Sequence, residues 1–160
     1  MEDKRYAPPK SDVEGQTAED LSPPLWNPNA AAVWSLLFTP IFGIWLHMFN
    51  WRALGETERA ESAKTWLMLT ALLIVGTLIG GVLMPFSGLL SVSRFGSFGL
   101  LLAWYFASAR PQARWVAERY GNRYRRRGWG QPLLGAVILI IGGSVGFGLL
   151  MTFFYVLFKG

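Results

Sequence analysis

Two long stretches of this chain carry no charged residue, and they constrain its fold more than any other feature of the sequence. They cover residues 65–84 and residues 132–158. About 20 apolar residues are enough for a helix to cross the ~30 Å hydrocarbon core of a bilayer. A helix on the surface of a soluble domain normally keeps a polar face, and neither stretch offers one. Both are therefore predicted to span a membrane.

The composition of the whole chain favours the same class. Hydrophobic residues make up 52% of the sequence and charged residues 16%, whereas soluble domains are about 25% charged. Two further apolar segments lie at residues 30–49 and 89–109. The predicted fold is an all-α polytopic membrane protein, a bundle of four hydrophobic segments. The last segment is longer than a bilayer requires, which implies a tilt or a bend at Gly142 and Gly143.

The chain divides into two parts. Residues 1–25 are polar and rich in acids and prolines, so they are predicted to form a disordered tail. Residues 26–160 are predicted to form the integral membrane domain. The multi-pass pattern indicates an integral membrane protein.

The first apolar segment contains Pro40 near its middle, and this leaves two arrangements open. Proline removes a backbone hydrogen bond and disfavours helix at the residue before it. A kinked span is the commoner outcome in membrane helices, and it would place the tail outside. A re-entrant hairpin that turns at Thr39 and Pro40 would place the tail inside.

The connection at residues 110–128 is strongly basic and carries a single acid, Glu118. Basic connections stay on the cytoplasmic side, so this one is predicted to be cytoplasmic and to face anionic lipid headgroups. From residue 112 its spacing predicts an amphipathic helix with its aromatic side in the lipid. The cluster is short and lies between two spans, which argues against nucleic acid as a partner. Its bases are Arg110, Arg114, Arg119, Arg123, Arg125, Arg126 and Arg127.

Residues 51–64 are predicted to form a solvated helix that continues out of the membrane. The i,i+3 pairs Glu56–Arg59 and Glu61–Lys64 would support it.

Small residues recur at helical spacing in three of the apolar segments. Such ridges let helix backbones approach closely, which matters because lipid provides no hydrophobic drive for helix association. Packing within one chain is the default expectation, and packing between copies in a homo-oligomer stays open. The predicted packing residues are Gly76, Gly80, Gly99, Ala103, Ala107, Gly142 and Gly146.

Residues that carry catalytic or metal chemistry are scarce. The chain has no cysteine and one histidine, which excludes thiolate metal sites, disulfides and multi-histidine sites. The cores of residues 65–84 and 132–158 hold no acidic or basic side chain that could move a proton. We therefore predict no enzymatic activity, no metal and no cofactor. One polar set in the first segment could form a recognition site if that segment is a hairpin, namely Asn27, Asn29, Thr39, His47 and Asn50.

Two stretches carry a resemblance to a known group of proteins. They are WNPNAAAVWSLLFTPIFGIWLHMFNWRALG at residues 26–55 and RYGNRYRRRGWGQPLLG at residues 119–135. The chain resembles a family of small uncharacterised multispan inner-membrane proteins of proteobacteria. The resemblance implies a multi-pass protein of the bacterial inner (cytoplasmic) membrane and carries no catalytic residue.

These observations predict a non-enzymatic protein that acts by binding within the bilayer. The specific hypothesis is an immunity-type inhibitor of a membrane-acting toxin, by analogy of size and location. Two alternatives stay open, an accessory or scaffold subunit of an envelope complex and a small oligomeric transporter or channel.

Overall fold

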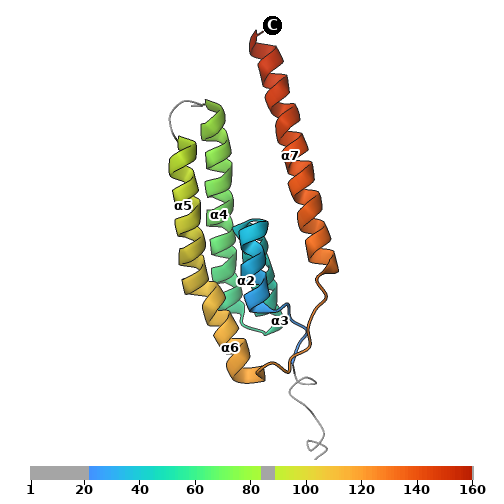
Figure 1. Cartoon of the computed structure of the whole chain (residues 1–160). Helices are drawn as coiled ribbons and strands as arrows, with labels where there is room; N and C mark the ends of the chain where they lie inside the picture. The colour runs from blue at the N-terminus through green and yellow to red at the C-terminus, as the bar shows by residue number, and fades with distance from the viewer. Residues whose placement is uncertain (1–21, 84–88, 160) are drawn as a thin grey trace, which may run out of the picture.

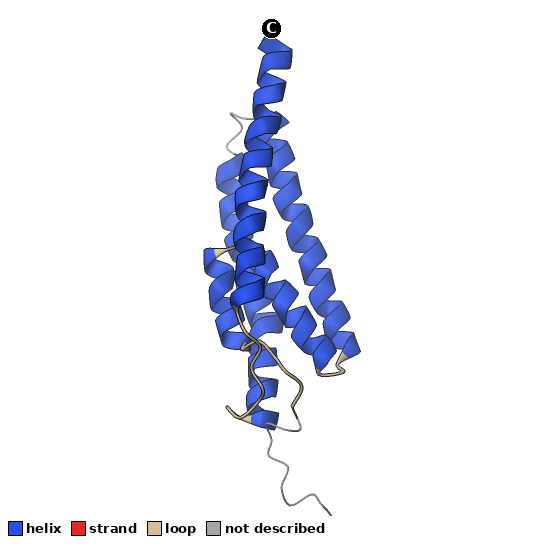
Figure 2. Cartoon of the chain, turned by 90° about the vertical axis from the view of Figure 1, so that its right-hand side faces the viewer, coloured by secondary structure: helices blue, strands red, loops and turns tan. Residues whose placement is uncertain are grey.

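The computed structural model describes residues 22–83 and 89–159, and these are almost entirely helical. Within them the only extended pairing is one β-bridge between Leu25 and Arg126, so the predicted all-α class is confirmed. Figures 1 and 2 show the helices, whose bounds in chain order are α2 (Pro28–Leu37), α3 (Pro40–Ala53), α4 (Thr57–Leu83), α5 (Leu89–Trp104), the π-helix η2 (Tyr105–Ala109), α6 (Arg110–Tyr120) and α7 (Gly130–Lys159).

The first apolar segment is a hairpin of two short helices, α2 and α3. Asn27 caps α2 by accepting hydrogen bonds from the backbone N–H groups of Asn29 and Ala30, and Pro28 begins the helix. Thr39 is fully extended (φ −167°, ψ 159°) and Pro40 starts α3. Proline disfavours helix at the preceding residue, so α2 ends before Pro40, and α3 packs back against α2. The kinked single span, which the sequence favoured as the commoner outcome, is not what the structure adopts.

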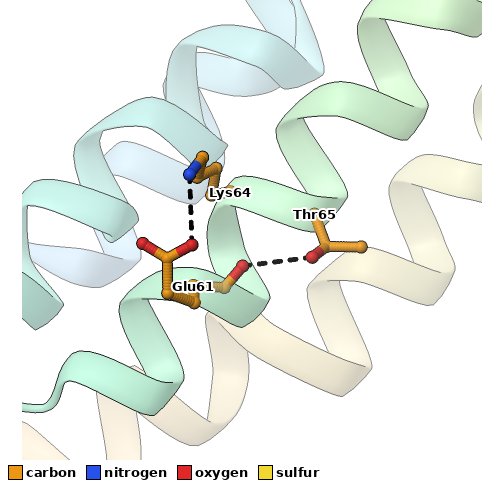
Figure 3. A network of polar contacts seen from close by, with 3 residues as sticks. All are labelled: Glu61, Lys64 and Thr65. Carbon is orange, nitrogen blue, oxygen red and sulfur yellow. Dashed lines mark hydrogen bonds and ion pairs between the residues drawn. The ribbon is translucent and has the colours of Figure 1, made fainter.

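The next long helix, α4, begins after a turn at Gly55, whose φ of +76° suits a residue without Cβ. This turn separates α3 from α4, so the predicted continuous helix over residues 51–64 is wrong. Both predicted ion pairs are confirmed: Arg59 Nε lies 3.6 Å from Glu56 Oε2, and Lys64 Nζ lies 3.2 Å from Glu61 Oε2. Figure 3 shows the second pair and the bond that Thr65 Oγ1 donates to the Glu61 carbonyl at 3.1 Å.

Helix α5 continues through the π-helix into α6 without a break. Pro111 explains the π turn, because its ring lacks an N–H and crowds the carbonyl four residues earlier, and a wider turn relieves both problems. Gly121 ends α6 with a φ of +58°. Val116 is buried, and Trp115 packs edge-to-face on Trp51 with ring centroids 5.6 Å apart. The prediction that the aromatic side of this helix enters the lipid is therefore wrong.

Helix α7 is joined to the rest only at its base. Ala136 and the flanking Leu133 and Trp129 pack against Phe42 and Leu46 of the hairpin. Every residue from 137 to 157 is exposed, and Figure 1 shows the helix standing apart from α4 and α5. The helix runs unbroken through Gly142 and Gly143, so the length of this segment does not produce a helix break there.

The residues just before the hairpin are ordered. Leu25 N donates to the Arg125 carbonyl at 2.9 Å, and Arg127 N donates to the Leu25 carbonyl at 2.8 Å. Leu25 is fully buried against Val116 and Tyr124, and Ser22 is also buried. The predicted disordered tail therefore stops short of residue 22, and residues 1–21 lie outside the described part of the chain.

Two described helices are long and apolar enough to cross a membrane, at residues Thr57–Gly80 and Gly130–Leu157. They contain the two uncharged stretches that the sequence singled out, apart from residues 81–84 and 158 at their ends.

Candidate functional site

A buried polar cluster holds the open end of the hairpin together. Asn50 Oδ1 accepts a hydrogen bond from Trp26 N at 3.0 Å, and Asn50 Nδ2 donates to the Trp26 carbonyl at 2.8 Å. The same Nδ2 lies 3.4 Å from Gln112 Oε1. Asn50 thus makes two hydrogen bonds with the backbone of Trp26, just before α2, and also contacts Gln112 of α6.

Gln112 and His47 complete the cluster, and both are fully buried. Gln112 Nε2 donates to the His47 carbonyl at 2.8 Å. His47 Nε2 lies 3.1 Å from the Pro28 carbonyl; since a carbonyl only accepts, Nε2 carries the proton. His47 Nδ1 and Trp104 Nε1 are buried without a partner in the described part of the chain, and the two rings meet edge-to-face at 5.3 Å.

Burial lowers the pKa of His47 to about 4, although its hydrogen bond with Pro28 acts in the opposite direction. The folded chain therefore holds a neutral imidazole. The unfolded chain, with an ordinary pKa of 6.5, takes up a proton first as the pH falls. Stability from this group is fully present above about pH 6.5 and is lost as the pH falls towards 4.

We expect the detergent-solubilised protein to lose about 2 kcal/mol of unfolding free energy between pH 7.5 and pH 5. His47 is the only histidine, so His47→Gln is the control and should remove most of this dependence. Thermal unfolding at both pH values measures it. An equal loss in the variant would assign the effect to other groups.

The structure brings together only part of the predicted polar set. Asn27, Asn29, His47 and Asn50 lie at the open end of the hairpin, where Asn29 is exposed, and Thr39 lies at the opposite end, at the turn. Asn27 is occupied by capping, and His47 and Asn50 bond to the protein's own backbone. These residues close the hairpin rather than offer an open polar recognition surface. The sequence reasoning missed Gln112, which lies 62 residues from Asn50 along the chain.

The closest backbone approach in the hairpin is at Gly43, which the sequence reasoning also missed. A Cβ added there would overlap Ser35 Oγ and would lie 2.9 Å from both the Ala31 carbonyl and the Trp104 ring. Trp104 is fully buried and packs with Ile44 and Ala109. Gly43 is therefore the point where α2, α3 and α5 are pressed together.

The predicted packing glycines are in a different environment. A Cβ added at Gly76, Gly99, Gly142 or Gly146 meets nothing within 4 Å. These positions make no close helix contact within the chain, contrary to the default expectation of intramolecular packing. Packing between chains stays a prediction for the whole set, which also includes Gly80, Ala103 and Ala107.

An apolar groove of about 530 Å³ lies between the hairpin and the base of α7, beside the contact that joins them. Its walls are almost entirely aliphatic and aromatic. It is lined by Trp26, Phe38, Thr39, Ile41, Phe42 and Trp45 on one side and by Gln131, Pro132, Gly135, Ala136, Leu139 and Ile140 of α7 on the other.

The basic connection, residues 110–128, lies at the same end of the molecule as the opening of the hairpin (Figure 1), and it carries seven arginines. Several of their guanidinium groups stack on aromatic rings: Arg119 Cζ is 4.3 Å from the Trp115 ring centroid and Arg127 Cζ is 4.6 Å from that of Trp26. Among the described residues none of the seven forms an ion pair. Their charges are available to an anionic surface or ligand.

Comparison of the chain with protein-family models, with curated proteins and with solved structures gave no match. The functional assignment therefore depends on the chemistry of the chain itself.

Proposed function

We propose that this chain is a multi-pass protein of the bacterial inner membrane that acts by binding, without catalysis. The exposure of its apolar helices supports this location. Only 11% of the apolar window in α4 and 6% of that in α7 is buried. A core helix of a soluble protein would bury most of such a surface, and large exposed apolar faces mark contact with lipid or with partners.

The proposed orientation places the arginine-rich connection in the cytoplasm. The hairpin opening and the start of α4 are at that end and the chain terminus after α7 is at the other (Figure 1). In this orientation α4, α5 and α7 span the bilayer, α2 and α3 re-enter from the cytoplasmic side, and the N-terminal tail is cytoplasmic.

Topology reporters test this orientation. A reporter fused after Tyr124 should be cytoplasmic, and reporters fused after residue 87 and after Lys159 should be periplasmic. A cytoplasmic signal after residue 87 would contradict the proposed arrangement.

We propose that α7 is the binding element and that its partner is a membrane helix of a membrane-acting protein, as for an immunity-type inhibitor. The observation that carries this proposal is that α7 is exposed at every residue from 137 to 157. Gly142 and Gly146 form a four-residue small ridge on it with open space above both. Such a ridge allows the close backbone approach on which helix association in lipid depends.

Co-expression with membrane-acting toxins encoded beside the gene tests the proposal. The unmodified chain should protect the cell. The double variant Gly142→Leu, Gly146→Leu should abolish protection, because the added side chains would prevent a partner helix from packing closely on α7. Gly76→Leu on α4 is the matched control, since its site is equally open within the chain. Unchanged killing by every neighbouring toxin would reject the immunity role, and cross-links from residue 142 only to a second copy would replace it with self-association.

A further inference from the structure

The groove between the hairpin and α7 matches the depth of one lipid leaflet. Its α7 wall extends from Gln131 to Ile140, which corresponds to about 14 Å at ~1.5 Å per residue. Half of a ~30 Å hydrocarbon core is ~15 Å. In the proposed orientation the groove therefore runs from the cytoplasmic headgroup level to the middle of the bilayer.

The lining of the groove suits a hydrocarbon chain. Its walls are almost entirely aliphatic and aromatic and include Phe38, Ile41, Phe42, Leu139 and Ile140. A flexible acyl chain needs no polar partner and can follow such walls.

The lower end of the groove carries positive charge. Trp26 lines the groove, and the Arg127 guanidinium carbon lies 4.6 Å from its ring centroid. Trp26 Nε1 donates to the Gly128 carbonyl at 3.1 Å, which fixes the ring beside the basic segment. Arg125 and Arg126 precede Arg127 directly and are exposed. A headgroup at this end would meet cations that form no ion pair with any described residue, and each contributes about 1 kcal/mol of attraction to an anionic lipid.

We propose that this groove is a binding site for one anionic phospholipid of the cytoplasmic leaflet. One of its two acyl chains lies between α3 and α7, and its phosphate faces Arg127. The lipid fills the gap beside the only packed part of α7 and so helps to hold that helix against the hairpin. This inference rests on the proposed membrane orientation and not on a protein partner.

Native mass spectrometry of the full chain in detergent tests the site. Phosphatidylglycerol and phosphatidylcholine with identical acyl chains are the probes. The unmodified chain should retain one phosphatidylglycerol in preference to phosphatidylcholine. Gly135→Leu should lose both lipids, because Gly135 lines the groove and an added Cβ there meets no protein atom. Gly143→Leu, on the same helix but outside the groove, should bind as the unmodified chain does.

Charge variants separate the headgroup from the acyl chain. Arg127→Gln should reduce the preference for phosphatidylglycerol by about fivefold, the equivalent of ~1 kcal/mol, while retaining a lipid. Arg123→Gln, an equal charge change elsewhere in the connection, should leave the preference unchanged.

Three outcomes would overturn the proposal. Lipid retention in Gly135→Leu equal to that in Gly143→Leu would show that the groove holds no lipid. Conversion of a dimer to a monomer by Gly135→Leu with lipid binding unchanged would make the groove a contact between copies. Equal retention of both lipids by the unmodified chain would show that the site does not select an anionic headgroup. The topology reporters are independent of these results, so failure of the lipid site and failure of the orientation are distinguishable.

Discussion

Gly43→Ala is expected to destabilise the protein more than alanine at any other helical glycine of known environment. The new Cβ would overlap Ser35 Oγ, which can rotate, and would approach the Ala31 carbonyl, which is part of the α2 backbone and cannot. The Trp104 ring closes the third side at 2.9 Å. Overpacking of this kind costs about 1–3 kcal/mol, and relief would require α2 and α3 to separate.

Thermal unfolding of the full chain in mild detergent measures this effect. Gly76→Ala is the matched control, because its site on α4 is open and alanine favours helix over glycine by up to about 1 kcal/mol. The two variants should therefore shift stability in opposite directions. Equal stability of Gly43→Ala and Gly76→Ala would contradict the close packing of α2, α3 and α5 at Gly43.

Asn50→Leu is expected to have the second large effect, because it removes the side chain that closes the hairpin. The substitution keeps the approximate size of the residue but leaves the N–H and carbonyl of Trp26 without their partner. Gln112 Oε1 loses a contact as well. Each unsatisfied buried group costs about 1–3 kcal/mol; since the Trp26 groups are only partly buried, we expect a total of about 2–4 kcal/mol.

The control for this variant is Asn122→Leu, at an exposed position after α6, which should change stability little. Loss of unfolding free energy in Asn50→Leu should be accompanied by faster proteolysis between residues 22 and 28, because the chain there is tied to Asn50. Equal stability of the two variants would show that the polar cluster does not hold the hairpin.

Local features of the helices could be predicted from the sequence. The uncharged stretches within α4 and α7 specify helices of membrane length, and the ion pairs of α4 follow from spacing alone. The turn at Thr39 and Pro40 was identified as a breaking point, but both a kink and a reversal satisfy proline chemistry. The outcome depended on Asn50 and Gln112, whose contacts join distant parts of the chain, and no local pattern encodes them.

The π turn at η2 is an intermediate case. Its cause, Pro111, is visible in the sequence, yet a proline at this place could equally have ended the helix. The structure instead continues the helix and turns Gln112 and Val116 inward, where both are buried. The same continuation places Trp115 on Trp51. The aromatic residues that were predicted to face lipid therefore pack within the protein.

The amino-acid sequence by itself determined where most of the helices lie and which two of them are long and apolar enough to cross a membrane, because hydropathy, capping and proline act over a few neighbouring residues. Only the tertiary structure decided that the first segment folds back, that Gly43 and not the regular glycine ridges is the point of close packing, and that a groove opens beside α7. These features depend on side chains that are far apart in the chain and meet only after the helices have packed.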